Sequence, residues 1–529
     1  MLTFIFALLS TIVVSVLLER FSKPKAWVAK GNANTLILHS AIISILFIAL
    51  TLIVQRPIFS GIALVVFFII VIAVSNAKFK ALKEPIVFSD FAMFSQAFKH
   101  PRLYFPFLGL APVIIAPIII IGLIVTVLTL EPAMAFTAQR IFLSLLAIIS
   151  FGFFSKSIAE KLELSANPEE DNARYGLINT LTAYTLQARS KKHKQQIVQT
   201  LQSSPFFARE STHKNTNTQS TPPHFYMMDS TFSEELSKDS KPNITVIQSE
   251  SFFDARRLHP SIKTDILKNF DACNAKSTQY GKLKVPAWGA NTMRSEFSFL
   301  TGLKYQDMGL YRYYPYQFIK KMPVSSIASA LQAQGYYCVC IHPHPASFFG
   351  REALFPKLGF DEFIDIGSFE GAEKFGPYIS DQAVTDKIFE ITKQITNKPL
   401  FIFSITMENH GPLHLEKTSK QEQSEYYSDT KVSGMSDLTV YLRHLKNADK
   451  MIKALTDNYR QSNRETTLCF YGDHIPSMPN IYQATDYADS HSDYFIWHSN
   501  PINSNVQINI SIESLAAKLL SYSKVSSVN

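Results

Sequence analysis

The sequence predicts an α-helical membrane bundle of about five spans, followed by an α/β domain with a mostly parallel sheet. Two observations predict this division. Long apolar stretches are confined to the first part of the chain, whereas short β-rich runs alternate with amphipathic segments from Pro242 onward. With 529 residues, the chain is long enough for several domains. We predict a transmembrane domain at 1–155, an amphipathic helix and linker at 156–241, and the α/β domain at 242–529.

The apolar stretches set the number of spans, because crossing a bilayer takes about 20 residues. The five candidates are Leu2–Leu18, Thr35–Val54, Ile58–Ser75, Phe107–Leu130 and Ile141–Phe154. The last of them is short, so an interfacial or buried helix is an alternative there. The first is not a cleaved signal peptide, since it lacks a basic start and more apolar stretches follow.

Basic residues gather beside these stretches and contribute to a net charge of +8. The clusters lie at Arg20–Lys30, Lys78–Lys83 and Arg189–Lys194. Beside membrane segments, such clusters indicate contact with lipid headgroups. The chain has no interleaved basic and aromatic pattern of the kind that binds nucleic acid. We therefore expect membrane lipid as a partner, and no nucleic acid.

The predicted connector has two parts. Leu162–Leu201 has helical spacing, and we expect it to run along the membrane surface. The stretch "ARESTHKNTNTQSTPPH" that follows is rich in Ser, Thr, Asn and Pro, which is typical of an irregular linker.

The α/β prediction rests on five strand-like runs with helix-length segments between them. The runs are "NITVIQ", "YYCVCI", "LFIFSI", "TLCFYG" and "DYFIWH", and the helical segments include Val324–Gln334, Asp381–Thr396 and Leu438–Asn458. Near-continuous apolar strands that alternate with helices favour a parallel sheet covered on both faces.

Four of the predicted strands are followed at once by carboxylate or imidazole side chains. These are Glu250, then His342 and His344, then Glu408, Asn409 and His410, and finally Asp473 and His474. Any one of them alone is better explained as a capping or turn residue than as a ligand. Because the carboxyl ends of parallel strands share one edge of a sheet, the four together predict a single shared site.

A fifth candidate lies in "VPAWGANTMRSEFSFLTGL", where a loop with Gly289 leads into a predicted helix. Thr292 stands at the start of that helix. It is either an N-cap, a position that Thr generally favours, or a nucleophile beside helix-terminal amides that stabilise anions.

As a set, these motifs resemble the sulfatase-type fold of the alkaline phosphatase superfamily. Glu250 after a strand, "GANTMRSEF", "ENHGP" and "YGDHIP" look like the motifs of lipoteichoic acid synthases and related phosphoglycerol transferases. The apolar bundle, "KEPIVFSDFAMFSQAF" and "HPHPASFFGREALFPKLGFDEF" are also similar to that family, so the resemblance covers nearly the whole chain.

The resemblance implies roles for individual residues. Four residues match the family's metal ligands: Glu250, Thr292, Asp473 and His474. Thr292 also matches the nucleophile. Four others match positions around the substrate phosphate: His342, Phe349, Arg351 and His410. Arg351 and His410 are expected to take part in catalysis. Phe349 stands where lipoteichoic acid synthases carry a tryptophan. Three oxygens and one imidazole suit one divalent cation, for which we favour Mn²⁺, with Mg²⁺ and Zn²⁺ as alternatives.

Departures from neighbouring families narrow the expected reaction. Sulfatases require a Cys or Ser followed by Pro and Arg two and four positions on, whereas this chain has Thr292-Met-Arg. Phosphoethanolamine transferases usually bring several disulfides and an acidic residue soon after their Asp-His pair, whereas His474 is followed by "IPSM".

The resemblance therefore favours transfer of glycerol phosphate from phosphatidylglycerol, through a covalent threonine intermediate, to an extracytoplasmic glycan or polymer. Two alternatives stay open. One is phosphoethanolamine transfer to a lipid-linked glycan, and the other is a non-catalytic membrane sensor or scaffold.

Charge and resemblance disagree on orientation. The positive-inside rule places the loops Glu19–Asn34 and Lys78–Arg102 in the cytoplasm, which with five spans leaves the α/β domain there too. The resemblance implies a multi-pass inner-membrane protein with its catalytic domain in the periplasm. We adopt this second orientation as the prediction, because the lipid donor chemistry and the glycan acceptors of that family lie outside.

Overall fold

The computed structural model describes residues 2–25, 33–93, 121–122, 124–126, 129–135, 137–207, 241–429, 434–502, 504–523 and 525. Contacts between residues divide the chain into one unit at Met1–Gln196 and another at Ile197–Asn529. The first unit is helical, and the second contains the sheet.

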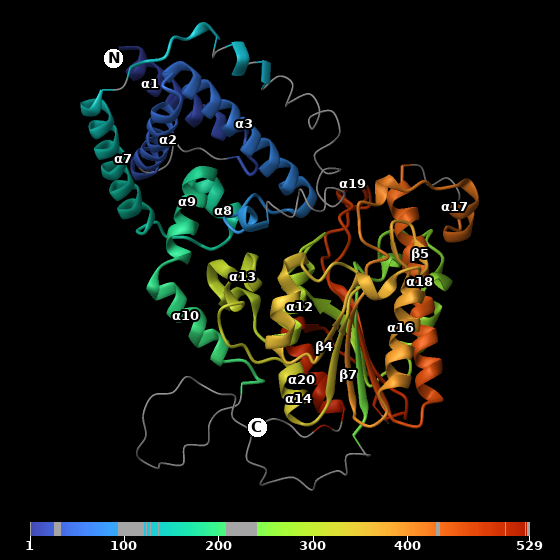
Figure 1. The fold of residues 1–529 in the computed structure, drawn as a ribbon. Helices are drawn as coiled ribbons and strands as arrows, with labels where there is room; N and C mark the ends of the chain where they lie inside the picture. Colours follow the sequence, from blue (N-terminus) through green and yellow to red (C-terminus); the bar gives the residue numbers. More distant parts are fainter. Residues whose placement is uncertain are drawn as a thin grey trace, which may run out of the picture. The chain divides into compact units, whose positions relative to one another are not determined.

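The helices of the first unit match the predicted bundle (Figure 1). They are α1 (Leu2–Leu18), α2 (Ala33–Val54), α3 (Pro57–Leu82), α7 (Ala138–Ala159), α8 (Pro168–Tyr175), α9 (Leu177–Ala188) and the first half of α10 (Lys191–Gln202). Within the described residues, four helices are long and apolar enough to cross a membrane: α1 with its extension to Phe21, α2, α3 and α7. The predicted span Phe107–Leu130 lies largely outside the described residues.

Helix α7 shows that the last predicted stretch was drawn too short. It has 22 residues rather than the 14 of Ile141–Phe154, because Thr137 caps its start by accepting the N–H of Arg140 and the helix continues past the apolar segment. The interfacial alternative for this stretch rested on its shortness. The observed helix is not short, since 22 residues rise about 33 Å in an α-helix, enough to cross a hydrocarbon core about 30 Å thick.

Helix α9 is fixed to the bundle within the first unit. The Glu19 carboxylate accepts the N–H groups of Leu177 (3.0 Å) and Ile178 (3.2 Å) at the start of α9. Both residues also pack against Phe68 of α3. An acidic side chain at a helix N-terminus satisfies amides that the helix itself leaves unpaired. That α9 runs along the membrane surface stays a prediction.

The second unit contains a large sheet with strand order β10-β2-β9-β8-β1-β7-β3-β4, and β11 also pairs with β2. The strands are β1 (Asn243–Ser249), β2 (Gln279–Lys284), β3 (Tyr337–Ile341), β4 (Glu362–Ile364), β7 (Leu400–Ile405), β8 (Thr466–Gly472), β9 (Ser492–His498), β10 (Val506–Gln507) and β11 (Ile510–Ser511). The run β8-β1-β7-β3-β4 is parallel, whereas β9 is antiparallel to both β8 and β2. The mostly parallel sheet is confirmed.

Helices cover both faces of this sheet, as Figure 1 shows, with α16 and α18 on one side and α12, α14 and α20 on the other. The helices are α11 (Lys268–Asn274), α12 (Thr292–Thr301), α13 (Pro315–Ile319), α14 (Ile327–Ala333), α15 (Arg351–Leu354), α16 (Asp381–Gln394), α17 (Lys420–Tyr426), α18 (Ser436–Arg460), α19 (Pro479–Ala484) and α20 (Ile512–Tyr522), and a hairpin joins β5 (Lys374–Phe375) to β6 (Tyr378–Ile379).

Alternate residues of each central strand serve the two cores. Ile247, Ile402 and Phe470 pack with the helices α16 and α18, whereas Phe403 and Tyr471 stack on Phe299 of α12 at ring distances of 5.7 and 5.0 Å. Burial on both faces explains why these strands lack polar alternation.

Candidate active site

The predicted strand ends lie at one edge of the sheet. Strands β8, β1, β7 and β3 are consecutive neighbours and all run parallel. Their carboxyl ends therefore face the same way. Asp473, Glu250, Thr406 and His342 are the residues that directly follow, or follow within one residue, the ends of these four strands. The sheet thus brings together residues that are up to 223 positions apart.

Glu250, Asp473 and His474 form a compact buried group, which we call the metal-ligand cluster. One ligand atom from each lies within 4.8 Å of the others. The His474 Nε2 atom is 3.6 Å from Glu250 Oε1 and 3.4 Å from Asp473 Oδ2. His474 Nδ1 donates to the Ile475 carbonyl oxygen at 3.0 Å, which leaves Nε2 as the lone-pair atom that faces the carboxylates.

Two atoms of this cluster lack hydrogen-bond partners. Among the described residues, nothing donates to the buried Asp473 Oδ2 or pairs with His474 Nε2. Burial raises the pKa of the Glu250 carboxyl, and the nearby Asp473 carboxylate raises it further. Carboxylate oxygens and a neutral imidazole nitrogen are donors that Mn²⁺, Mg²⁺ or Zn²⁺ accepts. The cluster therefore fits a divalent metal ion, whose charge would reverse the unfavourable electrostatics of the two carboxylates.

Ser251 holds the three ligands together. Its backbone N–H donates to Asp473 Oδ1 at 2.8 Å, and its hydroxyl donates to Glu250 Oε1 at 2.8 Å. The same hydroxyl oxygen lies 3.3 Å from His474 Nδ1. Ser251 has a φ of 56°, a left-handed conformation that is uncommon outside glycine. This strained turn points the amide and the hydroxyl at the cluster from one residue.

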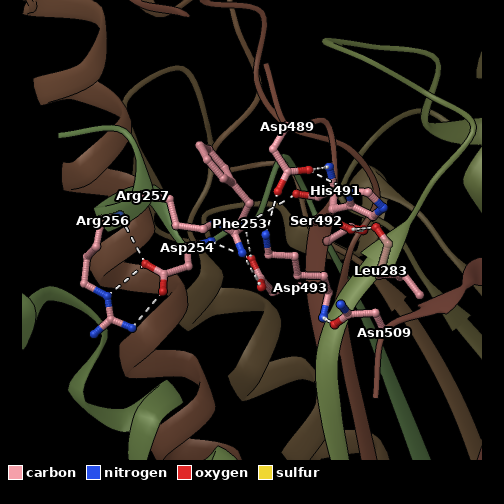
Figure 2. Close-up of polar contacts among 12 residues, drawn as sticks. Phe253, Asp254, Arg256, Arg257, Leu283, Asp489, His491, Ser492, Asp493 and Asn509 are labelled. Carbon is pink, nitrogen blue, oxygen red and sulfur yellow. Dashed lines mark hydrogen bonds and ion pairs between the residues drawn. The ribbon is translucent and has the colours of Figure 1, made fainter. Parts of the chain in front are cut away.

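The chain that leaves β1 runs close against the end of β8. A Cβ atom at Gly472 would collide with the Phe252 carbonyl oxygen, so only glycine fits before Asp473. Figure 2 shows how this segment is then anchored. The Asp254 N–H donates to Asp493 at 2.7 Å, and Arg257 forms a forked ion pair with the same carboxylate at 2.9 and 2.7 Å.

Thr292 is the first residue of α12, rather than the cap before it. Asn291 occupies the cap position with a φ of 71°. The loop before the helix is fastened to the segment after His474, because the Gly289 N–H donates to the Ile475 carbonyl at 3.0 Å. One turn on, the Ser295 hydroxyl donates to the Asp473 carbonyl at 2.6 Å.

These bonds hold the N-terminus of α12 beside the metal-ligand cluster. Thr292 is half-buried, whereas the rest of the helix is buried. Its hydroxyl forms no hydrogen bond with the described residues, so the oxygen is available to a ligand.

Arg351 is 1% exposed and forms a side-on pair with Glu296, Nε to Oε1 at 3.0 Å and Nη2 to Oε2 at 2.8 Å. Its Nη1 lies 3.3 Å from His342 Nε2. His342 Nδ1 donates to the Ile405 carbonyl at 3.2 Å, so Nε2 accepts from the arginine. Burial lowers the pKa of His342 well below its usual value, and the Arg351 charge lowers it further, which keeps this imidazole neutral.

Aromatic rings surround the guanidinium on another side. The Phe349 ring lies 5.1 Å from the Arg351 Cζ atom, in a cation–π arrangement, and Phe349 has a φ of 56°. The His344 ring is 5.7 Å from that of His342. The phenylalanine at the position expected for tryptophan therefore stacks on the arginine.

His410 is held by its Nδ1 atom. Nδ1 donates to the Gly411 carbonyl at 2.7 Å, and the Tyr378 hydroxyl donates to the same oxygen at 3.2 Å. Burial lowers the pKa of His410, although the Gly411 hydrogen bond and the Asp473 charge oppose this shift. At neutral pH the ring is therefore neutral, with Nε2 as its proton acceptor.

Glu408 belongs to a different group, although it follows the same strand as His410. Its Oε1 accepts from His444 Nδ1 at 3.1 Å and from Asn447 at 2.7 Å, and its Oε2 accepts the Asp381 N–H at 2.7 Å. The other nitrogen of His444 lies 3.0 Å from Glu416. We call Glu408, Glu416 and His444 the Glu408 cluster. Its charges pair with one another, and it has no ligand role in this geometry.

Sequence reasoning missed Ser251, Glu296 and Thr406, whose hydroxyl accepts the Glu250 N–H at 3.0 Å. A signal existed for Glu296, since a residue four positions after Thr292 lies on the same helix face. None existed for Ser251, whose role depends on a backbone turn.

Comparison with known proteins places this site in a family. The family model described as Sulfatase matches residues 242–525, more than half of the chain. The chain belongs to the sulfatase family. This membership confirms the predicted sulfatase-type fold of the alkaline phosphatase superfamily.

Similar proteins include the capsular polysaccharide biosynthesis protein RkpI of Rhizobium meliloti, 25% identical over 471 residues that cover 86% of this chain and 80% of that one. The lipooligosaccharide phosphoethanolamine transferase EptA of Neisseria meningitidis, an integral membrane protein, superposes with a TM-score of 0.52 at 11% identity and covers 98% of this chain and 96% of its own. The phosphoglycerol transferase GacH of Streptococcus pyogenes superposes with a TM-score of 0.46 at 23% identity, and the match covers 63% of this chain and 79% of the GacH chain.

The resemblance that the sequence motifs predicted is thus confirmed at the level of the sulfatase family. The EptA superposition also supports the combination of an apolar helical unit with a sulfatase-like domain in one chain.

Proposed function

We propose that the chain is a membrane-anchored, metal-dependent phosphoglycerol transferase that moves glycerol phosphate from phosphatidylglycerol to an extracytoplasmic glycan or polymer. One observation carries the proposal: Asp473 Oδ2 and His474 Nε2 are buried without hydrogen-bond partners, in a cluster to which the N-terminus of α12 is hydrogen-bonded. This arrangement supports a cation site next to the Thr292 hydroxyl.

The proposed first step is an exchange at phosphorus. Thr292 Oγ attacks the phosphate of the lipid, an Oγ–P bond forms, and the bond from phosphorus to the diacylglycerol oxygen breaks, while the Thr292 proton passes through solvent to that departing oxygen. Diacylglycerol leaves as the alcohol after taking up a proton. When bound by Glu250, Asp473 and His474, a divalent ion would lower the pKa of the hydroxyl and polarise the phosphoryl oxygens.

The residues around the phosphate divide the remaining work. Arg351 is proposed to donate N–H groups to a phosphate oxygen, a charge-assisted contact. His410, with Nε2 unprotonated, is proposed to take the proton from the acceptor hydroxyl that attacks phosphorus in the second step. That attack forms the acceptor O–P bond and breaks the Oγ–P bond, and His410 passes its proton to Thr292 Oγ, which restores the free hydroxyl.

The acceptor and the ion are proposals of the same kind. The candidate acceptors are a teichoic-acid-type chain, a periplasmic glucan and a capsular polysaccharide, and the name of RkpI supports the last. We favour Mn²⁺ over Mg²⁺ and Zn²⁺. Phosphoethanolamine transfer remains the second candidate, because EptA shares the arrangement of the whole chain.

Headgroup release tests the proposal directly. The full-length protein, reconstituted with headgroup-labelled phosphatidylglycerol or phosphatidylethanolamine, is assayed after metal removal and again after addition of each ion. We expect release of glycerol phosphate from phosphatidylglycerol, restored best by Mn²⁺ and absent in Thr292→Ala. Release from phosphatidylethanolamine alone would favour the second candidate, and metal binding without release from either lipid would favour a scaffold.

We also propose that the protein lies in the inner membrane with its catalytic domain in the periplasm. A reporter fused after Asn529 tests this orientation. Activity of a periplasm-dependent reporter is expected, and activity of a cytoplasm-dependent one would contradict it.

A further inference from the structure

The ion pair of Glu296 and Arg351 is the most completely buried charged contact near the site. Glu296 is 0% and Arg351 1% exposed, and both carboxylate oxygens are used by the guanidinium. The Tyr316 hydroxyl, itself fully buried, also donates to Glu296 Oε1. The Glu296 carboxylate is hydrogen-bonded to both the guanidinium and the phenol, so its orientation is fixed. It therefore also fixes the orientation of the Arg351 guanidinium.

The position of Glu296 connects the arginine to the helix of the nucleophile. Glu296 lies four residues after Thr292 in α12, one turn along the same face. Arg351 begins α15, which comes from a distant part of the chain. The ion pair therefore sets the guanidinium relative to the helix whose first residue is Thr292.

The remaining contacts of Arg351 leave part of its fork free. A guanidinium has five N–H groups. Among the described residues, Nε and Nη2 each give one to Glu296 and Nη1 gives one to His342, which leaves one N–H on Nη1 and one on Nη2. These two are the groups that an anionic oxygen could accept.

The positive charge of Arg351 also bears on the role of Glu296. Arg351 lies at the same edge of the sheet as Glu250, because its partner His342 directly follows β3 and Glu250 directly follows β1. An arginine without its own carboxylate would be drawn to Glu250 or Asp473, where it would compete with a cation. Glu296 holds the guanidinium away from these ligands and neutralises it.

We propose that Glu296 is a positioning residue, which orients Arg351 toward the substrate phosphate and keeps it off the metal-ligand carboxylates, with Tyr316 supporting Glu296. This proposal rests on the proposed function, in that the anion is taken to be the phosphate of a lipid headgroup. It gives Glu296 no direct contact with substrate.

The test compares Glu296→Gln and Tyr316→Phe with wild type in the full-length reconstituted protein. We expect kcat/KM for headgroup release to fall about 100-fold in Glu296→Gln, as for a misplaced substrate-binding group, and about 10-fold in Tyr316→Phe. In an Arg351→Gln background, Glu296→Gln should change kcat/KM by less than about 3-fold, because the group that it positions is gone.

A matched control separates positioning from stability. Asp449→Asn alters another buried carboxylate, which accepts the Phe270 N–H at 2.7 Å in a separate part of the fold. It should lower the melting temperature but leave kcat/KM within about 2-fold. Tyr316→Phe keeps its ring and its packing, so it tests the proposal even if Glu296→Gln does not fold.

Binding of glycerol phosphate, measured by calorimetry, provides a readout that needs no turnover. We expect Kd to rise about 10-fold in Glu296→Gln and to stay unchanged in Asp449→Asn. Unchanged binding and unchanged kcat/KM in both Glu296→Gln and Tyr316→Phe would overturn the inference. Losses that add fully to those of Arg351→Gln would also overturn it. If the wild type released no headgroup, yet its binding of glycerol phosphate still weakened in Glu296→Gln, the result would count against the proposed function alone.

Discussion

Two buried charged clusters lie in the α/β unit, and they differ in how their charges are satisfied. In the Glu408 cluster, both nitrogens of His444 face carboxylates, and Glu408 accepts two further N–H groups. In the metal-ligand cluster, Asp473 Oδ2 and His474 Nε2 have no such partners among the described residues. The first is a completed ion-pair network, whereas the second fits a divalent cation.

The difference shows that burial and charge alone do not identify a site. Both clusters join a histidine to two carboxylates at similar depth. What separates them is the placement of the ligand atoms: within the part of the chain that the structure describes, one such atom from each of Glu250, Asp473 and His474 lies within 4.8 Å of the others. We therefore expect substitutions in the metal-ligand cluster to act on activity, and substitutions in the Glu408 cluster to act on stability.

The largest effect is expected at the residue that would use the bound ion. Thr292→Ala should reduce headgroup release at least about 1,000-fold, because the nucleophile is lost. Its melting temperature should stay within about 2 °C of wild type, since a half-buried hydroxyl without hydrogen bonds contributes little to stability. Release assays and thermal melts on the same preparation check both. Near-normal release would remove Thr292 from the mechanism.

The next effect distinguishes the two clusters by metal content. Alanine at Glu250, Asp473 or His474 should each lower bound metal and activity together, because ligands that share one ion act as a unit. Glu408→Gln should keep its metal. Elemental analysis at limiting Mn²⁺ measures occupancy. Full occupancy in Glu250→Ala, or an equal loss in Glu408→Gln, would show that the clusters have been assigned wrongly.

A smaller effect is expected where Ser251 supports the ligands. Ser251→Ala removes the hydroxyl that orients Glu250 but keeps the backbone N–H to Asp473. Metal affinity should fall about 10- to 100-fold, as is typical when a hydrogen bond to a ligand is lost. Competition with a chelator gives the affinity. A variant that bound metal like wild type would show that the backbone turn alone fixes the ligands.

The smallest effect concerns pH and the Glu408 cluster. Although burial alone would lower the pKa of His444, Glu408 and Glu416 raise it to about 9. A histidine with a raised pKa stabilises the fold fully below its unfolded pKa of about 6.5, and this contribution is lost as pH rises through about 9. We expect the free energy of unfolding to decline over that interval.

The matched variant for this effect is His444→Gln, which cannot titrate. Urea unfolding of wild type should show a declining free energy of unfolding between pH 6.5 and 9, and the variant should show a flatter profile. Parallel profiles would mean that His444 is not charged in the folded protein.

The same contrast explains how far the sequence could predict the molecule. Strands β1, β3, β7 and β8 were readable because burial on both faces leaves continuous apolar runs, and their ends then located Glu250, His342, His410 and Asp473. Strands β2, β10 and β11 were not found, because they lie toward the edge of the sheet, where polar residues are tolerated.

The hydrogen-bond and ion-pair partners of the side chains in the site could not be predicted from the sequence. Glu408 and His410 both follow β7, yet one joins an ion-pair network and the other has Nε2 available as an acceptor. The partner of Arg351 comes from α12, 55 positions earlier in the chain. Such contacts depend on side-chain direction after the strands end, which periodicity does not encode.

The central claim is that Thr292 carries glycerol phosphate during the reaction. Full-length protein loaded with Mn²⁺ is incubated with phosphatidylglycerol in the absence of acceptor, and Thr292→Ala and His410→Ala are treated in parallel. Peptide mass spectrometry should find a glycerol phosphate adduct on Thr292, absent from Thr292→Ala and accumulated in His410→Ala. Continued multiple-turnover release without an adduct would contradict the account and would mean that water attacks the lipid phosphate directly.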